Sequence, residues 1–230
     1  MNKLLFFILF IFSVSQLRAQ DDTKQITVGG GAGFETARAG NQINKLEIAY
    51  FGNVSYYFNP YIDIKLQVQG GKLTGNSFNY FNDRNQKNFT NNYLAVFLEG
   101  DVQAGMFFDE SDNIFLNASR GLYVGVGAGL LNNKVTNSNF NNNAQLVNSV
   151  NSTSWIVPIK LGYEVNLITQ DGQPQLKIDG SYSFNYTTGK GLDGYSDKYS
   201  LHFKYFNYYS IGLKYVFTIT GLGSKHLTAD

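Results

Sequence analysis

The chain of 230 residues contains no cysteine, only 3 prolines and few charged residues. Without cysteine, a disulfide scaffold and a cysteine-ligated metal site are both excluded. Charged residues make up 15% of the chain, against about 25% in an ordinary soluble domain. The 18 basic and 17 acidic residues nearly balance, so the basic excess typical of nucleic-acid binding is missing. We therefore expect neither an ordinary soluble domain nor a nucleic-acid-binding protein.

Aromatic side chains are in excess, chiefly 19 Phe and 16 Tyr, together with 24 Gly. Disordered chains are poor in aromatic residues and rich in charge, so this composition predicts a folded protein. The mean hydropathy of −0.21 is too polar for a helical membrane protein. The chain is thus aromatic and poor in charge without being hydrophobic on average.

The first twenty residues have the pattern of a cleaved export signal. Lys3 precedes an almost unbroken apolar run from Leu4 to Val14, and Ala19 is a suitable residue before a cleavage site. The apolar run is shorter than the about 20 residues that a membrane-spanning helix needs. We therefore predict a signal peptide over residues 1–20 and an exported chain from residue 21.

Beyond residue 20, apolar and polar residues alternate with a period of two, which is the pattern of half-exposed β-strands. No segment shows a helical period, and Pro158, which lacks a backbone N–H, is expected to mark a bulge. In the segment 154–167, Asn166 is expected on the polar face. Eight segments fit the strand template: 25–36, 46–58, 61–73, 92–108, 121–131, 154–167, 175–187 and 204–219.

Short connections alternate along the chain with longer ones. Residues 59–60, 109–120 and 169–174 are rich in turn residues, whereas 74–91 and 132–153 are longer and rich in Asn. Outer-membrane barrels combine short periplasmic turns with longer extracellular loops. The sequence therefore predicts an all-β fold, an eight-stranded antiparallel up-and-down transmembrane β-barrel over residues 21–219. A short periplasmic tail is expected at residues 220–230.

The bulky apolar face is expected to contact lipid, because an eight-stranded barrel is just wide enough inside to be filled by side chains. The other face carries small residues such as Gly29, Gly31 and Gly33, which suit a narrow lumen. It also carries charged residues, which we expect to pair because an unpaired buried charge is costly. We expect these charges to fill the lumen, with a polar conduit for small ions as the alternative. The predicted lumen charges are Glu47, Asp63, Lys65, Glu99, Asp101, Lys160, Glu164, Lys177, Asp179 and Lys214.

The aromatic residues of the lipid-facing side are expected at the two ends of the strands, where aromatic girdles anchor a barrel at the membrane interfaces. The periplasmic girdle is expected to contain Tyr56, Phe58, Tyr61, Phe108, Tyr215 and Phe217. The outer girdle is expected to contain Phe34, Trp155, Phe184, Tyr186 and Tyr205.

The stretch SIGLKYVF at residues 210–217 resembles the terminal-strand signal of outer-membrane proteins. This resemblance implies that Ser210, Gly212, Tyr215 and Phe217 form an assembly signal read by the barrel-assembly machinery. The stretches WIVPIKLGYE at 155–164 and KGLDGYSDKY at 190–199 resemble the small, porin-family-like outer-membrane barrel family of Bacteroidetes. That resemblance implies a location in the bacterial outer membrane.

No pattern in the sequence points to catalysis. The two histidines, His202 and His226, do not stand in a nucleophile–base motif, so we expect no enzymatic activity, no cofactor and no metal. We expect a structural or surface-interaction role, with outer-membrane lipid around the barrel and a possible protein or surface partner at the long Asn- and aromatic-rich loops. Three alternatives stay open: a small porin-like channel, an accessory barrel of a Bacteroidetes protein secretion or gliding system, and a lipid-modifying enzyme.

Overall fold

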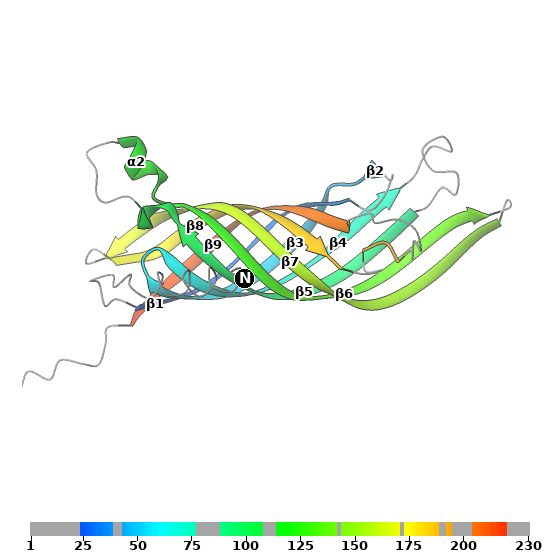
Figure 1. Ribbon diagram of the computed structural model, residues 1–230, viewed down its shortest axis with the longest axis horizontal. Coiled ribbons are helices and arrows are strands. Elements are labelled where there is room, and N and C mark those ends of the chain that lie inside the picture. The colour runs from blue at the N-terminus through cyan, green and yellow to red at the C-terminus, as the bar shows by residue number, and fades with distance from the viewer. Residues whose placement is uncertain are drawn as a thin grey trace, which may run out of the picture.

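The computed structural model describes residues 24–38, 43–76, 88–107, 114–141, 144–170, 173–188, 192–194 and 204–219. These residues form one antiparallel sheet that closes on itself as a barrel of long, tilted strands (Figure 1). The strands are β1 (Lys24–Arg38), β2 (Ile43–Asn44), β3 (Glu47–Asn59), β4 (Ile62–Asn76), β5 (Asn88–Gln103), β6 (Leu122–Asn141), β7 (Ala144–Gln170), β8 (Gln173–Thr187) and β9 (Lys204–Ile219). The predicted signal peptide and tail lie outside the described residues.

Each long strand pairs with its neighbour along the chain. The order around the ring is β1, β3, β4, β5, β6, β7, β8 and β9. Strand β9 then pairs with β1 along its full length, from Lys24 opposite Ile219 to Arg38 opposite Tyr205. The two-residue strand β2 pairs with the end of β4. Among the described residues, eight long strands thus form a ring without a free edge, which confirms the predicted up-and-down barrel.

Side chains that point out of the ring form a continuous apolar belt. On β5, for example, Leu94, Val96 and Leu98 are exposed, whereas the intervening Ala95 and Phe97 are buried. A closed ring satisfies the backbone hydrogen bonds of every strand, so it can expose such a belt to hydrocarbon. The belt and the closure together make this a transmembrane barrel, with the apolar face outward as predicted.

The strands β6 and β7 continue well beyond this belt and form a projecting hairpin (Figure 1). They contain 20 and 27 residues, whereas about 9–11 residues suffice for a tilted strand to cross a bilayer. The prediction of loops at 74–91 and 132–153 is therefore wrong in part. Strand β4 extends to Asn76 and β5 begins at Asn88, while β6 and β7 occupy most of 132–153. Phe89, Val135 and Asn137 remain buried on the inward face of these extensions. Because their outward neighbours become polar, the apolar–polar contrast that marks a strand disappears there.

The connection between β5 and β6 contains helical turns, which the sequence did not predict. The 3-10 turn η1 spans Ala104–Met106, and the helix α2 spans Ile114–Ser119. The predicted strand at 92–108 accordingly ends at Gln103, and Phe108 lies outside the described residues. A helix of six residues is too short for a 3.6-residue period to be recognised. Neither of the described helical segments is long and apolar enough to cross a membrane.

The expected bulge at Pro158 is not present. Strands β6 and β7 keep the same register on both sides of it, with Val126 opposite Ile159 and Gly129 opposite Ile156. Only the pairs in between are missing, because proline has no N–H to donate to the ladder. A register shift lies instead between Asn166 and Ile168. Asn166 itself stands opposite the lumen residue Lys177, on the polar face as predicted, and is exposed near the end of the strand.

The outward position of Trp155 gives a direct test of the belt. Trp155 is the single tryptophan of the chain. Its side chain is 63% exposed, near the end of the belt from which the hairpin of β6 and β7 projects. In bilayers of brominated phosphatidylcholine, we expect its fluorescence to be quenched more by bromines near the headgroup than by bromines near the chain ends.

The matched control moves the tryptophan to the middle of the belt. In a Trp155→Phe/Ile211→Trp variant, the new residue replaces a side chain that is 65% exposed on β9. The order of quenching should then be reversed. Equal quenching of both proteins by both lipids would show that the belt does not lie across the bilayer.

Candidate functional site: the filled lumen

The inward faces of the strands bring nine of the ten predicted lumen charges together. They lie in the half of the barrel next to the short turns, which we call the turn end. Each is less than one-tenth exposed. The nine residues, called the lumen network below, are Asp63, Lys65, Glu99, Asp101, Lys160, Glu164, Lys177, Asp179 and Lys214. Glu47 lies apart, at the opposite end of β3, where it is half-buried opposite Glu35 of β1.

One part of the lumen network joins β4, β5 and β7. The Lys65 ammonium on β4 binds the Asp101 carboxylate on β5 and lies 3.8 Å from the nearest Glu99 oxygen. From β7, Lys160 places its ammonium 2.7 Å from the same Glu99 oxygen. Lys160 also donates a hydrogen bond to the Gln67 side-chain oxygen at 3.2 Å. These contacts reach across the lumen, since β4 and β7 are not neighbours in the ring.

A second part is centred on the Glu164 carboxylate of β7. It accepts hydrogen bonds from the ammonium groups of Lys214 and of Lys177, the latter at 3.3 Å. The Gln103 amide donates to it at 3.0 Å, and the Tyr57 hydroxyl lies 2.9 and 3.0 Å from its two oxygens. The Lys177 ammonium also lies 4.3 Å from the centre of the Tyr57 ring. Because β3 lies opposite β7 in the ring, the bond from Tyr57 spans the lumen.

Tyr123 contacts the third group of charges in the lumen network, the ion pair of Lys214 and Asp179. Lys214 lies 2.5 Å from an Asp179 oxygen, and the Tyr123 hydroxyl donates to Asp179 at 2.8 Å. The Lys65 ammonium lies 5.3 Å from the centre of the Tyr123 ring, within the range of a cation–π contact. The aromatic rings therefore fill space between the charges and contact them.

Residues of like charge stand directly opposite each other on neighbouring strands of the lumen network, an arrangement that is destabilising by itself. Three such pairs are Asp63 and Asp101, Glu164 and Asp179, and Lys177 and Lys214. The ion pairs run diagonally between these positions, as in Lys65–Asp101, Lys177–Glu164 and Lys214–Asp179. The diagonal contacts thus offset the repulsion between direct neighbours.

Glycines provide the space that this arrangement needs. A Cβ added at Gly125 would collide with the Asp101 carboxylate, and one at Gly162 would collide with the Tyr123 ring. At Gly29 it would lie 2.8 Å from the Lys214 side chain. The small residues predicted on the lumen face therefore lie against the large inward side chains of neighbouring strands.

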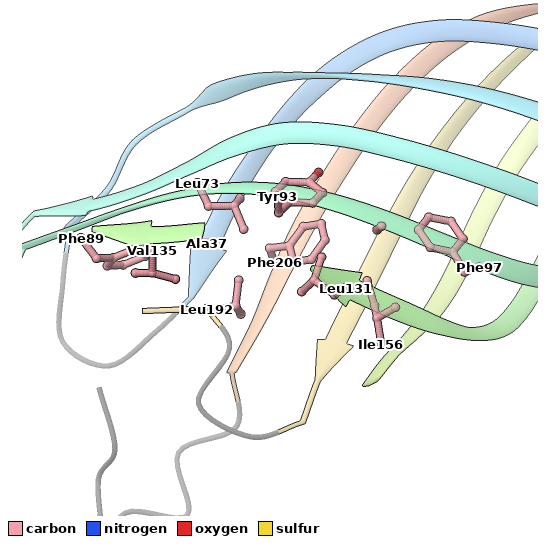
Figure 2. Close-up of a cluster of buried hydrophobic side chains, with 11 residues drawn as sticks. Ala37, Leu73, Phe89, Tyr93, Phe97, Leu131, Val135, Ile156, Leu192 and Phe206 are labelled. Carbon is pink, nitrogen blue, oxygen red and sulfur yellow. The ribbon is translucent and has the colours of Figure 1, made fainter. Parts of the chain in front are cut away.

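The half of the lumen nearer the long loops, called the loop end, contains a cluster of buried hydrophobic side chains. Figure 2 shows the cluster of buried side chains there, with Leu192 beside Phe206 and Leu131. Leu192 belongs to the connection between β8 and β9, and its side chain lies inside the mouth of the barrel. The cluster consists of Ala37, Leu73, Phe89, Tyr93, Ala95, Phe97, Leu131, Val135, Ile156, Leu192 and Phe206.

Polar contacts hold residues 192–194 in place. The Lys204 ammonium lies 2.5 Å from the Asp193 carboxylate, and both residues are buried. The Asn137 amide donates to the Asp193 carbonyl at 3.2 Å. Residues 192–194 therefore cover the apolar cluster at the loop end.

Glu35 is a lumen carboxylate that the sequence analysis missed. It is fully buried on β1 and accepts a hydrogen bond from the Tyr93 hydroxyl, to which Gln69 donates at 2.6 Å. Its position two residues after Gly33, on the face already assigned to the lumen, was sufficient to identify it.

Aromatic residues occupy both faces of the wall, whereas the sequence analysis placed them on the lipid side. The described residues of the two predicted girdles lie outward, with exposed or half-buried side chains, except for Tyr61. Tyr61 stands opposite the inward residue Gln103, and its ring contacts Arg120. However, four tyrosines are buried inside the barrel: Tyr57, Tyr93, Tyr123 and Tyr208. Period-two alternation could have found them, because each shares its face with predicted lumen residues.

The predicted assembly signal straddles the wall of β9. Ser210 and Gly212 face the lumen, and the Ser210 hydroxyl lies 2.9 Å from that of Ser181. Tyr215 and Phe217 point outward with ring centres 4.8 Å apart. Recognition of these residues by an assembly machinery stays a prediction.

The described residues contain no group of His, Cys, Asp or Glu side chains arranged to hold a metal ion. His202 and His226 lie outside them. The arrangement of the lumen network is suited to bonding opposite walls of the barrel together and to filling the space between them.

A closed eight-stranded ring with an apolar exterior and a filled polar lumen defines the class of small transmembrane β-barrels. The sequence matches no family model and no curated protein. Ail, the attachment invasion locus protein of Yersinia pestis, is similar in structure, with 12% identity over 84% of this chain and 99% of that one, and a TM-score of 0.48. Neisserial surface protein A is similar at 14% identity, with 83% and 96% covered and a TM-score of 0.42.

A major outer membrane protein from Thermus thermophilus is similar at 12% identity, with 84% of this chain and 99% of that one covered and a TM-score of 0.45. The last two proteins are thus described as a surface protein and an outer membrane protein. At these identities the likeness concerns the fold alone.

Removal of the Glu164 carboxylate should show how strongly the lumen network stabilises the barrel. A Glu164→Ala substitution leaves Lys177 and Lys214 without this partner in a buried site. We expect the free energy of unfolding to fall by about 3–5 kcal/mol. Urea unfolding of the barrel in lipid vesicles, followed by tryptophan fluorescence, measures this difference.

Glu47→Ala is the matched control, because Glu47 is an inward carboxylate outside the lumen network. This variant should unfold within about 1 kcal/mol of the wild type. If the two variants unfold at the same urea concentration, the lumen network does not stabilise the barrel.

Proposed function

We propose that the protein is a non-enzymatic integral barrel of the bacterial outer membrane with a structural and surface-interaction role. The observation that carries this proposal is a filled lumen beneath a projecting hairpin. Side chains bridge the lumen at successive levels, through the Tyr57–Glu164, Lys160–Glu99 and Tyr93–Glu35 contacts. Leu192 and Asp193 cover the loop end. A lumen occupied in this way favours a structural barrel over a small porin.

The hairpin of β6 and β7 supplies the surface for interaction. Its outward side chains beyond the belt include Asn132, Lys134 and Asn151, which are exposed. Such polar, amide-rich strands offer many hydrogen-bond donors and acceptors to a protein or surface partner. The export signal and the terminal-strand signal support delivery to the outer membrane and insertion by the barrel-assembly machinery. In this orientation the turn end faces the periplasm and the hairpin faces outward.

Planar bilayer recording separates this role from that of a channel. Because bonded side chains fill the lumen, we expect the folded wild-type barrel to produce no stable conductance steps after insertion. A heat-dependent shift on an electrophoresis gel should show that the inserted protein is folded. Stable, sizeable steps from the folded protein would support the porin alternative instead.

The absence of cysteine from the native chain allows a test of location and orientation with single cysteines. Val147 on the hairpin is 62% exposed, and Phe115 on α2 at the turn end is 78% exposed. In intact cells, a membrane-impermeant maleimide should label Val147→Cys but not Phe115→Cys. After the outer membrane is permeabilised, both should react.

The two cysteine variants control each other, since both side chains are exposed on the same protein. Labelling of Phe115→Cys alone in intact cells would reverse the orientation. Protection of both variants in intact cells would place the protein in a membrane other than the outer one.

A further inference from the structure

The lumen face of the described strands carries charges of both signs, whereas their outer face carries positive charges alone. Every acidic residue in the described strands faces the lumen: Glu35, Glu47, Asp63, Glu99, Asp101, Glu164 and Asp179. The charged residues that point outward from these strands are all basic: Lys24, Arg38, Lys72 and Lys134. The outer surface of the described barrel is therefore complementary to an anionic partner.

Two of these cations stand in one row across four neighbouring strands. In the pairing of β4 to β7, Lys72 lies opposite Asn92, Asn92 opposite Lys134, and Lys134 opposite Asn151. All four side chains are exposed on the outer face. Neither lysine forms an ion pair with a described residue. We call this row, with its neighbours Asn132 and Thr153, the polar shelf.

The polar shelf borders a hollow of about 630 Å³ in the outer wall. Asn92, Lys134 and Asn151 line it, together with Asn132 and Thr153, which are joined by a hydrogen bond of 2.8 Å. Leu94 lines the side of the hollow that is nearer the apolar belt. The hollow is therefore apolar on the side of the belt and polar on the side of the long loops.

The polar shelf lies directly above the apolar belt. On β5, β6 and β7, the next outward row toward the belt consists of Leu94, Asn132 and Thr153. The row after that consists of Val96, Leu130 and Trp155. Along β6 and β7, the outward side chains thus change from apolar (Leu130 and Trp155) to polar (Lys134 and Asn151) within four residues. An exposed tryptophan at such a boundary typically lies at the level of the lipid headgroups.

We propose that the polar shelf binds the phosphorylated saccharide headgroup of an outer-leaflet glycolipid. The two lysines are placed to contact phosphate groups, and a lysine near a membrane surface attracts anionic lipid. The three asparagines and Thr153 are placed to bond sugar hydroxyls, while the acyl chains lie along the apolar belt. This inference rests on the proposed outer-membrane location, because it requires the loop end to face the glycolipid leaflet.

The lipid can be tested on the purified full-length barrel in zwitterionic detergent, with Trp155 as the reporter. The probe is lipid A that carries both phosphates. We expect saturable changes in tryptophan emission with the wild type. A Lys72→Gln/Lys134→Gln variant should bind about thirtyfold more weakly at low ionic strength, and added salt should weaken wild-type binding more than variant binding.

Arg38→Gln is the matched control, since it removes an outward cation at the same end of the barrel but on β1. We expect its affinity to stay within twofold of the wild type. A heat-dependent gel shift should show that each variant is folded, so that lost binding is not lost structure.

Several outcomes would overturn the inference. They are wild-type affinity in the double lysine variant, an equal loss in Arg38→Gln, and equal binding of lipid A without phosphates. Displacement of lipid A by an equal concentration of inorganic phosphate would also overturn it, since the polar shelf would then bind free phosphate. The cysteine-labelling experiment reports the location separately. A failure here with correct labelling therefore rejects only the glycolipid.

Discussion

Hydrocarbon offers no hydrogen-bond partner, so each backbone N–H and carbonyl of a spanning strand must bond to another strand. In this chain the requirement is met by the full-length pairing of β9 with β1, which leaves the ring without an edge. Closure with eight strands also fixes a narrow bore. The inward side chains must therefore fit a small volume, and the glycines beside Asp101, Tyr123 and Lys214 make that fit possible.

Within this bore the inward side chains are sorted along the barrel axis. The lumen network with Tyr57 and Tyr123 occupies the turn end. A hydrophobic cluster that includes Leu192 occupies the loop end, together with the Lys204–Asp193 ion pair. A buried charge is stabilising only where its partners are all in place. The diagonal pairs meet this condition for Lys177 and Lys214, which stand directly opposite each other and each bind an acidic side chain on a neighbouring strand. The outer wall is simpler, with an apolar belt and then a row of amides and lysines.

The sequence predicts those features of the barrel that depend on alternation alone. Strict period two identified eight strands and the inward face of Asp63, Glu99 and Lys160, because burial and polarity alternate in phase with the pleat. It failed where that contrast is absent. Asn132 to Asn141 and Ala144 to Thr153 extend strands outside the belt, where both faces carry polar residues.

Partners across the lumen were beyond the reach of sequence reasoning. Alternation shows that Tyr57 and Glu164 both point inward, but not that β3 and β7 stand opposite each other at the same height. That height depends on the stagger between neighbouring strands, which accumulates around the ring. The register also decides that Lys134 falls beside Asn92 and Asn151. Candidate residues could thus be named from the sequence, whereas their groupings required the closed structure.

The hydrogen bonds and ion pairs of Glu164 have a consequence for how such a protein can change over time. This one carboxylate joins Tyr57 of β3, Gln103 of β5, Lys177 of β8 and Lys214 of β9 to its own strand β7. A substitution at that position alters the surroundings of side chains from five strands at once. Among descendants of this sequence, these positions should therefore vary together or not at all, while the outward residues of the same strands drift independently from one apolar side chain to another.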